Sequence, residues 1–369
     1  MIRHQGNNPK KAQRNRSVLY CDHLLKNKSE KIDLRRLYLG IQLRMEHSNT
    51  HCFHYLCENA KLMLGAIIGD VVGSTYEFHN TKDYNFKLFP EGSKYTDDTI
   101  MSLAIASWLM KMGVRDYRVN TPTILQSLEE ELVKYGKMFP NPTGGYGGGF
   151  ATWLFHPEML KSYGEDQEND YYESATGRHP YNSWGNGSAM RAAPLGWLFG
   201  TSPGLKGTLA LRKLTWIAGG VSASITHNAI EGLDGASAVA CAVAYALDGK
   251  SKDEIRKQIE QDFGYDLHES WEYWHRVYGW DSSCQGTVPQ AMICFLDSTD
   301  FEDAIRKAVS LGGDSDTLAC ITGGIAEAYY KEIPSFMAHK ALDTLPEVLK
   351  DLLKDFQDKV GYKDIVKLI

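Results

Sequence analysis

Two short clusters of oxygen-bearing side chains stand just before apolar, helix-like stretches. The first is TDDT, residues 96–99, within KYTDDTIMSL. The second is DSDT, residues 314–317, within LGGDSDTLAC, where a Gly pair precedes it. Asp and Thr are also favoured N-caps, because their oxygens accept the free backbone N–H groups of a helix's first turn. Taken alone, each cluster is compatible with an ordinary helix start or with half of a metal site.

Taken together, the two clusters supply four carboxylates and several hydroxyl oxygens. Mg²⁺ and Mn²⁺ prefer oxygen ligands of this kind. The positive end of a helix repels cations, so only a surplus of carboxylates makes such a site workable. Cys and His pairs at zinc-binding spacing are missing from the sequence, which disfavours zinc. The pair of clusters therefore predicts a site for hard divalent cations.

The composition is that of a globular protein with an uneven charge distribution. Apolar residues make up 43% of the 369 residues, and the net charge is −6. A net negative charge is not typical of a nucleic-acid-binding protein, so no stable nucleic-acid binding is expected. Residues 1–62, however, carry 12 Lys and Arg against 5 Asp and Glu, a net charge of +7.

This basic leader, residues 1–62, differs in composition from everything that follows. Two interpretations stay open: it is an appended, poorly ordered arm, or it lies upstream of a natural start at Met63. It lacks the apolar core of a signal peptide. We expect no stretch of the chain to supply the roughly 18 apolar residues of a membrane span. The seven scattered cysteines form no secreted disulfide framework. We therefore expect a monomeric cytoplasmic protein that does not associate with membranes.

From residue 63 onward the chain is dominated by helical periodicity. Convincing alternating strands and a strand–helix rhythm are missing. Long Gly-rich polar insertions interrupt the pattern near 140–150 and 163–190, and such insertions are more often functional than accidental. The sequence predicts a single all-α domain over 63–369. The clearest helices are expected in residues 99–113, 121–137, 228–249, 299–313 and 317–334, the fourth opening with a capping box from Thr299 to Glu302.

Six motifs occur in an order that resembles the ADP-ribosylglycohydrolase family. They are GAIIGDVVGSTYEF (65–78), YTDDTIMSLA (95–104), GGYGGGF (144–150), SWGNGSAMRAAPLG (183–196), THNAIEG (226–232) and LGGDSDTLACITGGIAEAYY (311–330). The resemblance covers about 65–335. It implies an orthogonal all-α bundle with two divalent cations at helix N-termini, Mg²⁺ first and Mn²⁺ as the alternative. The implied ligands are Thr96, Asp97, Asp98, Asp314, Asp316 and Thr317.

The resemblance also implies the reaction, the hydrolysis of the glycosidic bond between ADP-ribose and an acceptor. Cleavage at C1 of the ribose builds positive charge on the ring and requires a water, which cations can orient and acidify. A carboxylate must then move protons. Glu77, in GSTYEF, is the first candidate, because in many relatives a Glu here sits in a mobile loop over the site. Asp97 is the alternative.

The glycine-rich motifs suggest an anion-binding role. Glycine permits close approach and the backbone conformations that aim N–H groups at a pyrophosphate. Neither GGYGGGF (144–150) nor WGNG (184–187) is a GxGxxG fingerprint that follows a strand. Rossmann-type dinucleotide binding is therefore not expected. By resemblance, the diphosphate and the ADP-ribose cleft involve Gly147, Gly148, Gly149, Ser183, Trp184, Gly185, Asn186 and His227, with Trp184 placed to stack on adenine.

Two other classes of protein remain as alternatives. One is a binding or structural relative that kept the fold without the activity. The other takes D-S-D as the DxD motif of a nucleotide-sugar glycosyltransferase, which normally uses an α/β fold. The expected partners are an ADP-ribosylated substrate and ADP-ribose. The sequence leaves the acceptor open between arginine, serine, a nucleic-acid base and an acetyl ester.

Overall fold

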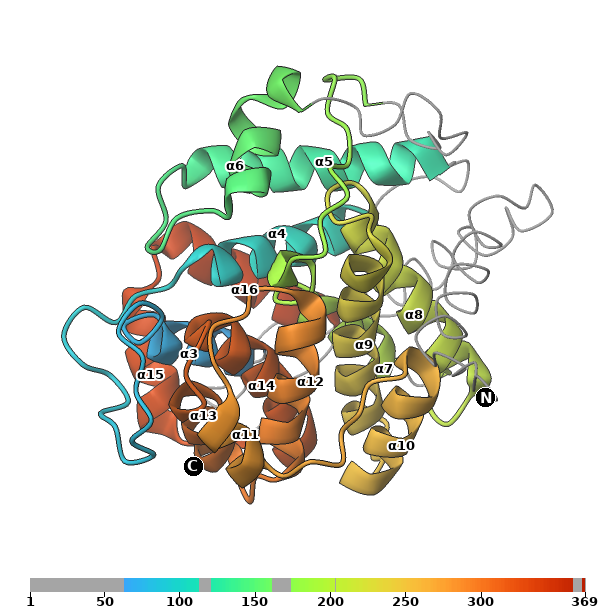
Figure 1. Cartoon of the computed structure of the whole chain (residues 1–369). Coiled ribbons are helices and arrows are strands. Elements are labelled where there is room, and N and C mark those ends of the chain that lie inside the picture. Colours follow the sequence, from blue (N-terminus) through green and yellow to red (C-terminus); the bar gives the residue numbers. More distant parts are fainter. Residues whose placement is uncertain (1–62, 113–120, 161–173, 203, 361–366, 369) are drawn as a thin grey trace, which may run out of the picture.

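Helices make up almost all of the regular structure (Figure 1). The computed structural model describes residues 63–112, 121–160, 174–202, 204–360 and 367–368. In these ranges the α-helices are α3 (Leu64–Gly73), α4 (Asp97–Met112), α5 (Thr121–Met138), α6 (Gly148–Phe155), α7 (Ala193–Gly200), α8 (Leu209–Ser224), α9 (Ile230–Leu247), α10 (Lys252–Phe263), α11 (Trp271–Val277), α12 (Cys284–Leu296), α13 (Phe301–Ser310), α14 (Ser315–Tyr330), α15 (Ser335–Thr344) and α16 (Glu347–Val360). The all-α prediction is confirmed.

Short elements complete the description. Two 3₁₀ turns, η2 (Pro157–Met159) and η3 (Asn186–Ser188), follow α6 and precede α7. The two-residue strands β1 (Glu332–Ile333) and β2 (Lys367–Leu368) pair in parallel. The basic leader, residues 1–62, lies outside the described residues, so its proposed role remains a prediction.

The helix α14 is the centre of the bundle. It packs against α3, α13, α12, α9, α7 and α4, and its residues from Ser315 to Ala328 are buried. The contact with α3 is a backbone contact, because a Cβ added at Gly69 would lie 1.9 Å from the carbonyl oxygen of Ala319, and one at Gly73 would lie 2.4 Å from Cα of Asp316. These glycines bring α3 directly against the DSD segment.

The helix α9 is the second buried helix. Ala and other small side chains line it, and α7, α8, α10 and α12 pack around it. Its 18 residues have a mean hydropathy of 1.3, so by length and composition it qualifies as a membrane span. The expectation that no stretch would do so was therefore wrong. In the structure 83% of this helix is buried, as in the core helix of a globular bundle.

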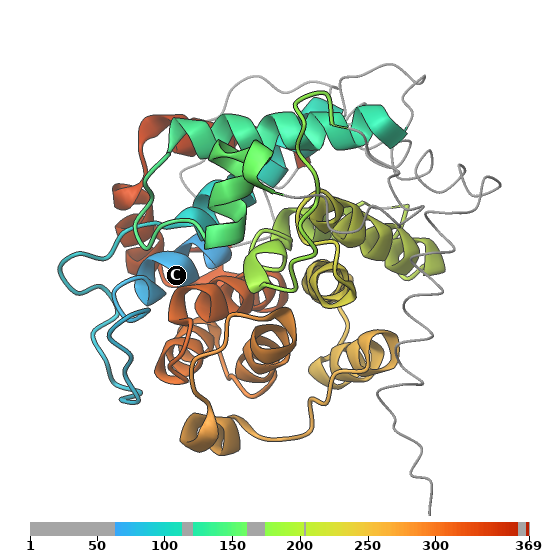
Figure 2. The same ribbon diagram turned by 45° about the horizontal axis from the view of Figure 1, so that its top comes forward.

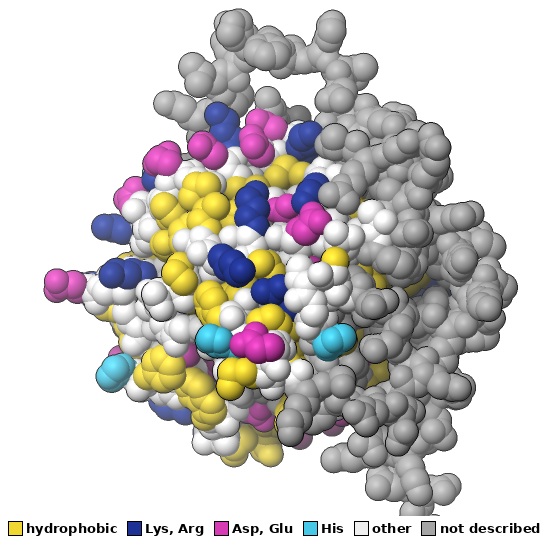
Figure 3. All heavy atoms as spheres, turned by 90° about the horizontal axis from the view of Figure 1, so that it is seen from above, with side chains coloured by type: hydrophobic (Ala, Val, Ile, Leu, Met, Phe, Trp, Pro, Cys, Tyr) yellow, Lys and Arg dark blue, Asp and Glu magenta, His cyan; other side chains and the backbone are white. Residues whose placement is uncertain are grey.

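The helices α5 and α6 cover one end of the bundle, above α4 (Figures 1 and 2). On that face, seen in Figure 3, the side chains of Lys and Arg alternate with those of Asp and Glu among hydrophobic ones, and the visible described surface shows no large area of one charge. The segment between α3 and α4 meets the segment between α5 and α6 where Thr96 and Thr143 form an isolated β-bridge.

A buried carboxylate anchors the start of the described domain. Glu327 of α14 is fully buried, and its Oε2 accepts a hydrogen bond of 2.8 Å from the N–H of Gly65 in the first turn of α3. Burial raises the pKa of Glu327 to about 8, against the lowering effect of the N–H groups of Gly65, Leu64 and Met63. Free N–H groups at a helix start are a favourable site for a carboxylate, so Glu327 fixes the entry of α3 against α14.

Candidate active site

Asp70 organises the first oxygen cluster, although it lies in another helix. It is fully buried in α3, and it is the one charged residue of that helix. Its carboxylate accepts hydrogen bonds from the N–H and hydroxyl of Thr96, at 3.0 and 2.7 Å, and from the N–H and hydroxyl of Thr99, the former at 3.1 Å. Burial raises the pKa of Asp70 to about 6 in spite of these donors. Asp70 therefore holds the TDDT turn in place.

With Thr96 and Thr99 held by Asp70, the two central aspartates are left for the cavity. The hydroxyl oxygen of Thr96 accepts a hydrogen bond from the N–H of Asp98 at 3.2 Å, as an N-cap side chain does. Asp97 and Asp98 both line the cavity described below. The helix-start and metal-site interpretations of TDDT are thus compatible, because Thr96 forms the cap while the carboxylates face the cavity.

The second cluster reaches the same place from α14. Asp314 stands at the N-cap position but makes no capping hydrogen bond. Its Oδ2 instead accepts a hydrogen bond of 2.8 Å from Nδ2 of Asn186, which also donates to Oγ1 of Thr287 at 3.1 Å. Thr317 donates its hydroxyl to Oδ1 of Asp98 at 3.3 Å, which joins the two clusters directly.

Glu77 completes the carboxylate group. Its carboxylate lies with those of Asp314 and Asp316 so that one oxygen from each falls within 4.8 Å of the others. Burial, followed by the charges of Asp314 and Asp70, raises the pKa of Glu77 to about 7. A carboxyl group with such a pKa holds or releases a proton near neutral pH, as an acid or base catalyst must.

The segment that carries Glu77 is tied to the DSD motif. Nδ2 of Asn80 donates to the carbonyl oxygens of Tyr76, Glu77 and Gly313, at 2.7, 2.8 and 2.9 Å. Its Oδ1 accepts a hydrogen bond of 2.8 Å from the N–H of Gly313. Lys82 adds hydrogen bonds from its Nζ to the carbonyl oxygens of Leu311, Tyr278 and His275. Glu77 is therefore positioned by the same loop that presents Asp314.

The carboxylate group fits a hard divalent cation. Burial and mutual repulsion raise the pKa of Asp97, Asp98 and Asp316 well above the usual value. Oδ2 of Asp98 is buried and has no hydrogen-bond partner in the described part of the protein. Carboxylates this close together repel one another unless a cation lies between them. The unpaired Oδ2 of Asp98 is available as a ligand for such a cation. An all-oxygen donor set of this kind suits Mg²⁺ or Mn²⁺.

A cavity of about 430 Å³ extends from these carboxylates to the glycine-rich loops. Gly147, Gly148 and Gly149, at the start of α6, line another part of it, the glycine-rich end. A Cβ at Gly147 or Gly148 would meet no atom within 4 Å, so the backbone there faces open space. The free N–H groups of a helix start favour anions. Gly144, with a φ of 78°, touches the carboxylate end, because its Cβ would lie 2.8 Å from Oε2 of Glu77.

Arg191 is a buried cation at the glycine-rich end. It is 1% exposed and lines the cavity, and its Nη2 donates to the carbonyl oxygen of Ser222 and to Oγ1 of Thr226, at 3.0 and 2.8 Å. Its Nε has no hydrogen-bond partner, and no carboxylate of the described residues forms an ion pair with it. Burial lowers the pKa of Arg191 to about 10, which leaves it charged at neutral pH.

His227 stands beside Arg191 in the neutral state. Burial and the neighbouring guanidinium lower the pKa of His227 well below 6.5. Its Nδ1 lies 2.8 Å from Oγ1 of Thr226, and its Nε2 lies 3.1 Å from the position of a Cβ on Gly187. His227 therefore offers a neutral ring to the cavity, which Tyr181 also lines.

Most, but not all, of the predicted site residues meet at this cavity. The lining includes Glu77, Asp97, Asp98, Gly147, Gly148, Gly149, Ser183, Gly185, Asn186, His227, Asp314, Asp316 and Thr317. Thr96 and Trp184 are not part of the lining: Thr96 is buried against Asp70, and the side chain of Trp184 is 56% exposed. A ligand role for Thr96 and an adenine stack on Trp184 stay predictions.

Sequence reasoning missed several residues of this site. Asp70 had a visible signal, since it is the only charge in an otherwise apolar helix. Arg191 lies in the motif SWGNGSAMRAAPLG, but nothing in that motif indicates that its guanidinium is buried without a carboxylate partner. The exposed Phe78 and Trp280 also line the cavity, and they carried no signal in the sequence.

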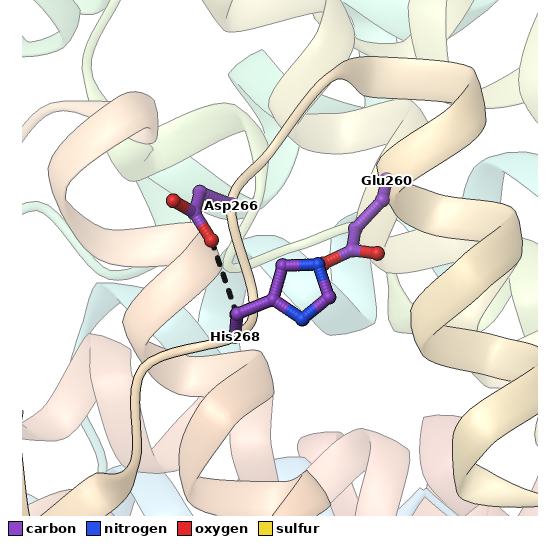
Figure 4. A group of neighbouring side chains, drawn as sticks. All are labelled: Glu260, Asp266 and His268. Atoms are coloured by element: carbon purple, nitrogen blue, oxygen red, sulfur yellow. Dashed lines mark hydrogen bonds and ion pairs between the residues drawn. The ribbon is translucent and has the colours of Figure 1, made fainter.

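A second group of possible ligands lies in α10 and the segment after it (Figure 4). Asp266 and His268 are exposed, and Nε2 of His268 lies 3.4 Å from Oε1 of Glu260. The N–H of His268 donates to Asp266, and that of Leu267 donates to Glu260. These bonds shape a local turn, and no orphaned buried oxygen marks the group as a cation site.

Comparison with known proteins gives the family to which this all-α chain belongs, a family of hydrolases. A sequence model of ADP-ribosylglycohydrolases matches residues 60–363. The chain belongs to the ADP-ribosylglycohydrolase family, and the resemblance noted in its motifs is confirmed.

Individual relatives agree with this membership. The chain is 28% identical over 332 residues to the human ADP-ribosylhydrolase ARH3, with 73% of this chain and 84% of that protein covered. It is 26% identical over 284 residues to the ADP-ribosylarginine hydrolase Tri1 of Pseudomonas putida, with 73% and 69% covered. A solved structure described as an ADP-ribosylglycohydrolase-related protein complex shares the fold, with a TM-score of 0.54 and 22% identity over 87% of this chain and 98% of that one.

Proposed function

We propose that this protein is a metal-dependent hydrolase that cleaves the glycosidic bond between ADP-ribose and an acceptor, and so reverses ADP-ribosylation. The observation that carries the proposal is one cavity with five carboxylates at one end and a glycine-rich helix start at the other. The first end suits cations at a reacting ribose, and the second suits a diphosphate.

At the carboxylate end, Asp97, Asp98, Asp314, Asp316 and Thr317 would hold two divalent cations, Mg²⁺ first and Mn²⁺ as the alternative. When bound, these cations would orient the ribose diol and acidify a water near C1. Asp70 and Asn186 act as positioning residues, since they hold the TDDT turn and Asp314.

Glu77 is the proposed proton-transfer residue. Water must add to C1 of the ribose while the bond from C1 to the acceptor atom breaks, and the acceptor must gain a proton. Glu77, with a pKa of about 7, accepts the proton of the water and returns it to the leaving acceptor. Asp97 is the alternative base, although its position in the carboxylate group also suits metal binding.

At the glycine-rich end, the N–H groups at the start of α6 would receive the diphosphate. Arg191 supplies a positive charge that no carboxylate of the described residues offsets, and His227 supplies a neutral hydrogen-bonding ring. A buried guanidinium without a carboxylate is costly, so an anionic ligand is its natural counter-charge.

The alternatives lose support for different reasons. A glycosyltransferase DxD motif belongs on an α/β fold, and the described fold is all-α. A catalytically silent relative stays the second candidate, although all five carboxylates of the cavity, Glu77 among them, are in place. We also propose that the protein is cytoplasmic and monomeric. Cell fractionation tests the location, and size-exclusion chromatography tests the oligomeric state.

The direct test is release of ADP-ribose from a panel of ADP-ribosylated acceptors, with Mg²⁺, with Mn²⁺ and with a chelator. We expect release from at least one acceptor that depends on the added cation. Binding of ADP-ribose without release from any acceptor would favour the silent relative. Release that continues unchanged in the chelator would overturn the metal-dependent reaction.

A further inference from the structure

We propose that Phe78 and Trp280 form the surface on which the acceptor lies, and that this surface selects a flat cationic acceptor, the guanidinium of an arginine side chain. The inference rests on the proposed function, because it concerns the acceptor side of the same cavity. It addresses what the motifs leave open, the choice between arginine, serine and nucleic-acid acceptors.

The two aromatic rings form an exposed stack at the edge of the cavity. Their centroids are 5.8 Å apart with an interplanar angle of 20°. Phe78 is 64% exposed and Trp280 is 52% exposed, yet both line the cavity. Large apolar side chains exposed together at the rim of a polar cavity are typical of a binding surface.

The position of the stack places it on the acceptor side. Phe78 follows Glu77 directly in the chain, and Trp280 lies in the segment between α11 and α12 that also contributes Ser282 to the lining. Gly147, Gly148 and Gly149, where the diphosphate is proposed to bind, belong to a different segment, at the start of α6. A macromolecular acceptor stays outside the cavity, so its modified side chain must enter past residues exposed beside Glu77.

The segments that carry the two rings are held before any ligand arrives, and the rings stack on each other. The segment of Phe78 is fixed by the hydrogen bonds of Asn80 to Gly313. The segment of Trp280 is fixed by Lys82, which donates to the carbonyl oxygen of Tyr278, and by the hydroxyl of Tyr278, which donates to the carbonyl oxygen of Gly286 at 2.8 Å. A pre-formed surface loses little conformational entropy on binding.

The chemistry of the rim favours a guanidinium. A planar cation stacks on aromatic faces, and Trp is the best of them. An aliphatic hydroxyl such as that of serine gains nothing from a ring face. A nucleic-acid acceptor would need cations for its phosphates, but the one Lys or Arg in the described lining is Arg191, which is buried at the other end.

The experiment compares ADP-ribosylarginine with ADP-ribosylserine as substrates of the full chain. Phe78→Ala and Trp280→Ala should each lower kcat/KM for the arginine substrate about 10-fold, because the stacking and cation–π contacts are lost. With the serine substrate the change should stay within about 2-fold. Trp280→Phe keeps an aromatic face and should restore most of the arginine activity, whereas Trp280→Leu should not.

A matched control is Phe336→Ala. Phe336, in α15, is 50% exposed like Phe78 but does not line the cavity. It should leave the ratio of the two activities unchanged. If Trp280→Ala lowers both activities equally, the pair serves only to hold the loop of Glu77 and the acceptor inference is wrong. A wild-type preference for serine, or for an ADP-ribosylated nucleic acid, would also overturn it.

Failure of this inference is distinguishable from failure of the proposed function. If the wild-type protein releases ADP-ribose from none of the acceptors, the hydrolase proposal itself fails. If it releases ADP-ribose with a cation but the aromatic variants leave the arginine-to-serine ratio unchanged, only the acceptor surface is refuted.

Discussion

The two ends of the cavity are built in opposite ways. At the carboxylate end the functional groups are side chains, and two of them are held by partners from distant parts of the chain, Asp314 by Asn186 and Asp98 by Thr317. At the glycine-rich end the functional groups are mainly backbone N–H groups at the start of α6. The difference shows how one fold handles opposite charges: cations need fixed carboxylates, whereas a diphosphate needs backbone that can approach closely.

The charges that remain uncompensated also differ between the two ends. The carboxylate end holds surplus negative charge, with an orphaned oxygen on Asp98. The glycine-rich end holds one buried cation, Arg191. We infer that each end is completed by a ligand of opposite charge, and the following variants test the two ends separately, from the largest effect to the smallest.

The largest effect is expected for Asp316→Asn. The change removes one carboxylate from the group, so divalent-cation binding and ADP-ribose release should both fall to near background while the helical fold survives. Cation binding is measured by calorimetry and the fold by circular dichroism. Glu260→Gln, in the exposed second group, is the control and should keep both properties. Wild-type hydrolysis by Asp316→Asn would refute the binuclear site.

Glu77→Gln should lower turnover by roughly 10²–10⁴, the usual contribution of a positioned acid or base. Cation binding and ADP-ribose affinity should change little, because neither depends on the proton of Glu77. The comparison is Asp97→Asn, which should lose cation binding as well as rate. If Glu77→Gln keeps near-full turnover while Asp97→Asn loses turnover with its cations retained, the two roles are reversed.

Arg191→Met tests the glycine-rich end. Removing the buried cation should weaken ADP-ribose binding by about 10- to 100-fold, the cost of an unpaired charged ligand group. Binding of adenosine, which lacks the diphosphate, should change far less, and cation binding should persist. Arg178→Met is the matched control, since Arg178 is also buried, but its Nη1 lies 4.0 Å from Oε1 of Glu129 and the residue is not part of the lining. Equal losses for ADP-ribose and adenosine would mean that Arg191 is structural only.

A pH series should separate the two ends in the unmodified protein. The raised pKa values of Asp97, Asp98 and Asp316 mean that protons compete with cations, so Mg²⁺ affinity should fall at least several-fold from pH 7.5 to 5.5. Burial and the charge of Arg191 lower the pKa of His227, so protonation of this ring is disfavoured as the pH falls. Cation-free binding of ADP-ribose should therefore stay flat, and calorimetry at several pH values measures both. A steep fall in both affinities would contradict the separation.

The smallest effect is expected from deleting residues 1–62. Every residue of the described lining lies after residue 63, and Glu327 already anchors the first turn of α3. A protein that begins at Met63 should fold and release ADP-ribose at the rate of the full chain. Loss of soluble, active protein would show that the leader is part of the domain.

The sequence predicted the helices well where periodicity was strong. The helices α4, α5, α9, α13 and α14 all lie within a few residues of their expected ranges. Helix ends were less predictable, because capping depends on local geometry. The expected capping box from Thr299 to Glu302 is wrong: Asp300 is the N-cap, and its side chain accepts a hydrogen bond from the N–H of Asp303.

The residue types of the two oxygen clusters predicted ligands for a cation. That the clusters lie side by side could not be predicted, because their proximity depends on contacts between distant parts of the chain. The bond from Thr317 to Asp98 joins residues 219 positions apart, and the bond from Asn186 to Asp314 spans 128 positions. Asn186 was expected at the substrate, whereas the structure also shows it holding a carboxylate. Such pairs follow from how α3, α4, η3 and α14 pack, and no spacing in the sequence reveals them.

The side chain of Asn80 has a consequence for motion. Four hydrogen bonds meet on this amide, and two of them cross to Gly313, next to Asp314. The loop of Glu77 therefore cannot move away from Gly313 without breaking both of these cross-links together, in the manner of a small cooperative unfolding event rather than a fast loop fluctuation. Amide hydrogen exchange at Gly313 would then report each opening, and the frequency of opening would limit how fast substrate enters and product leaves.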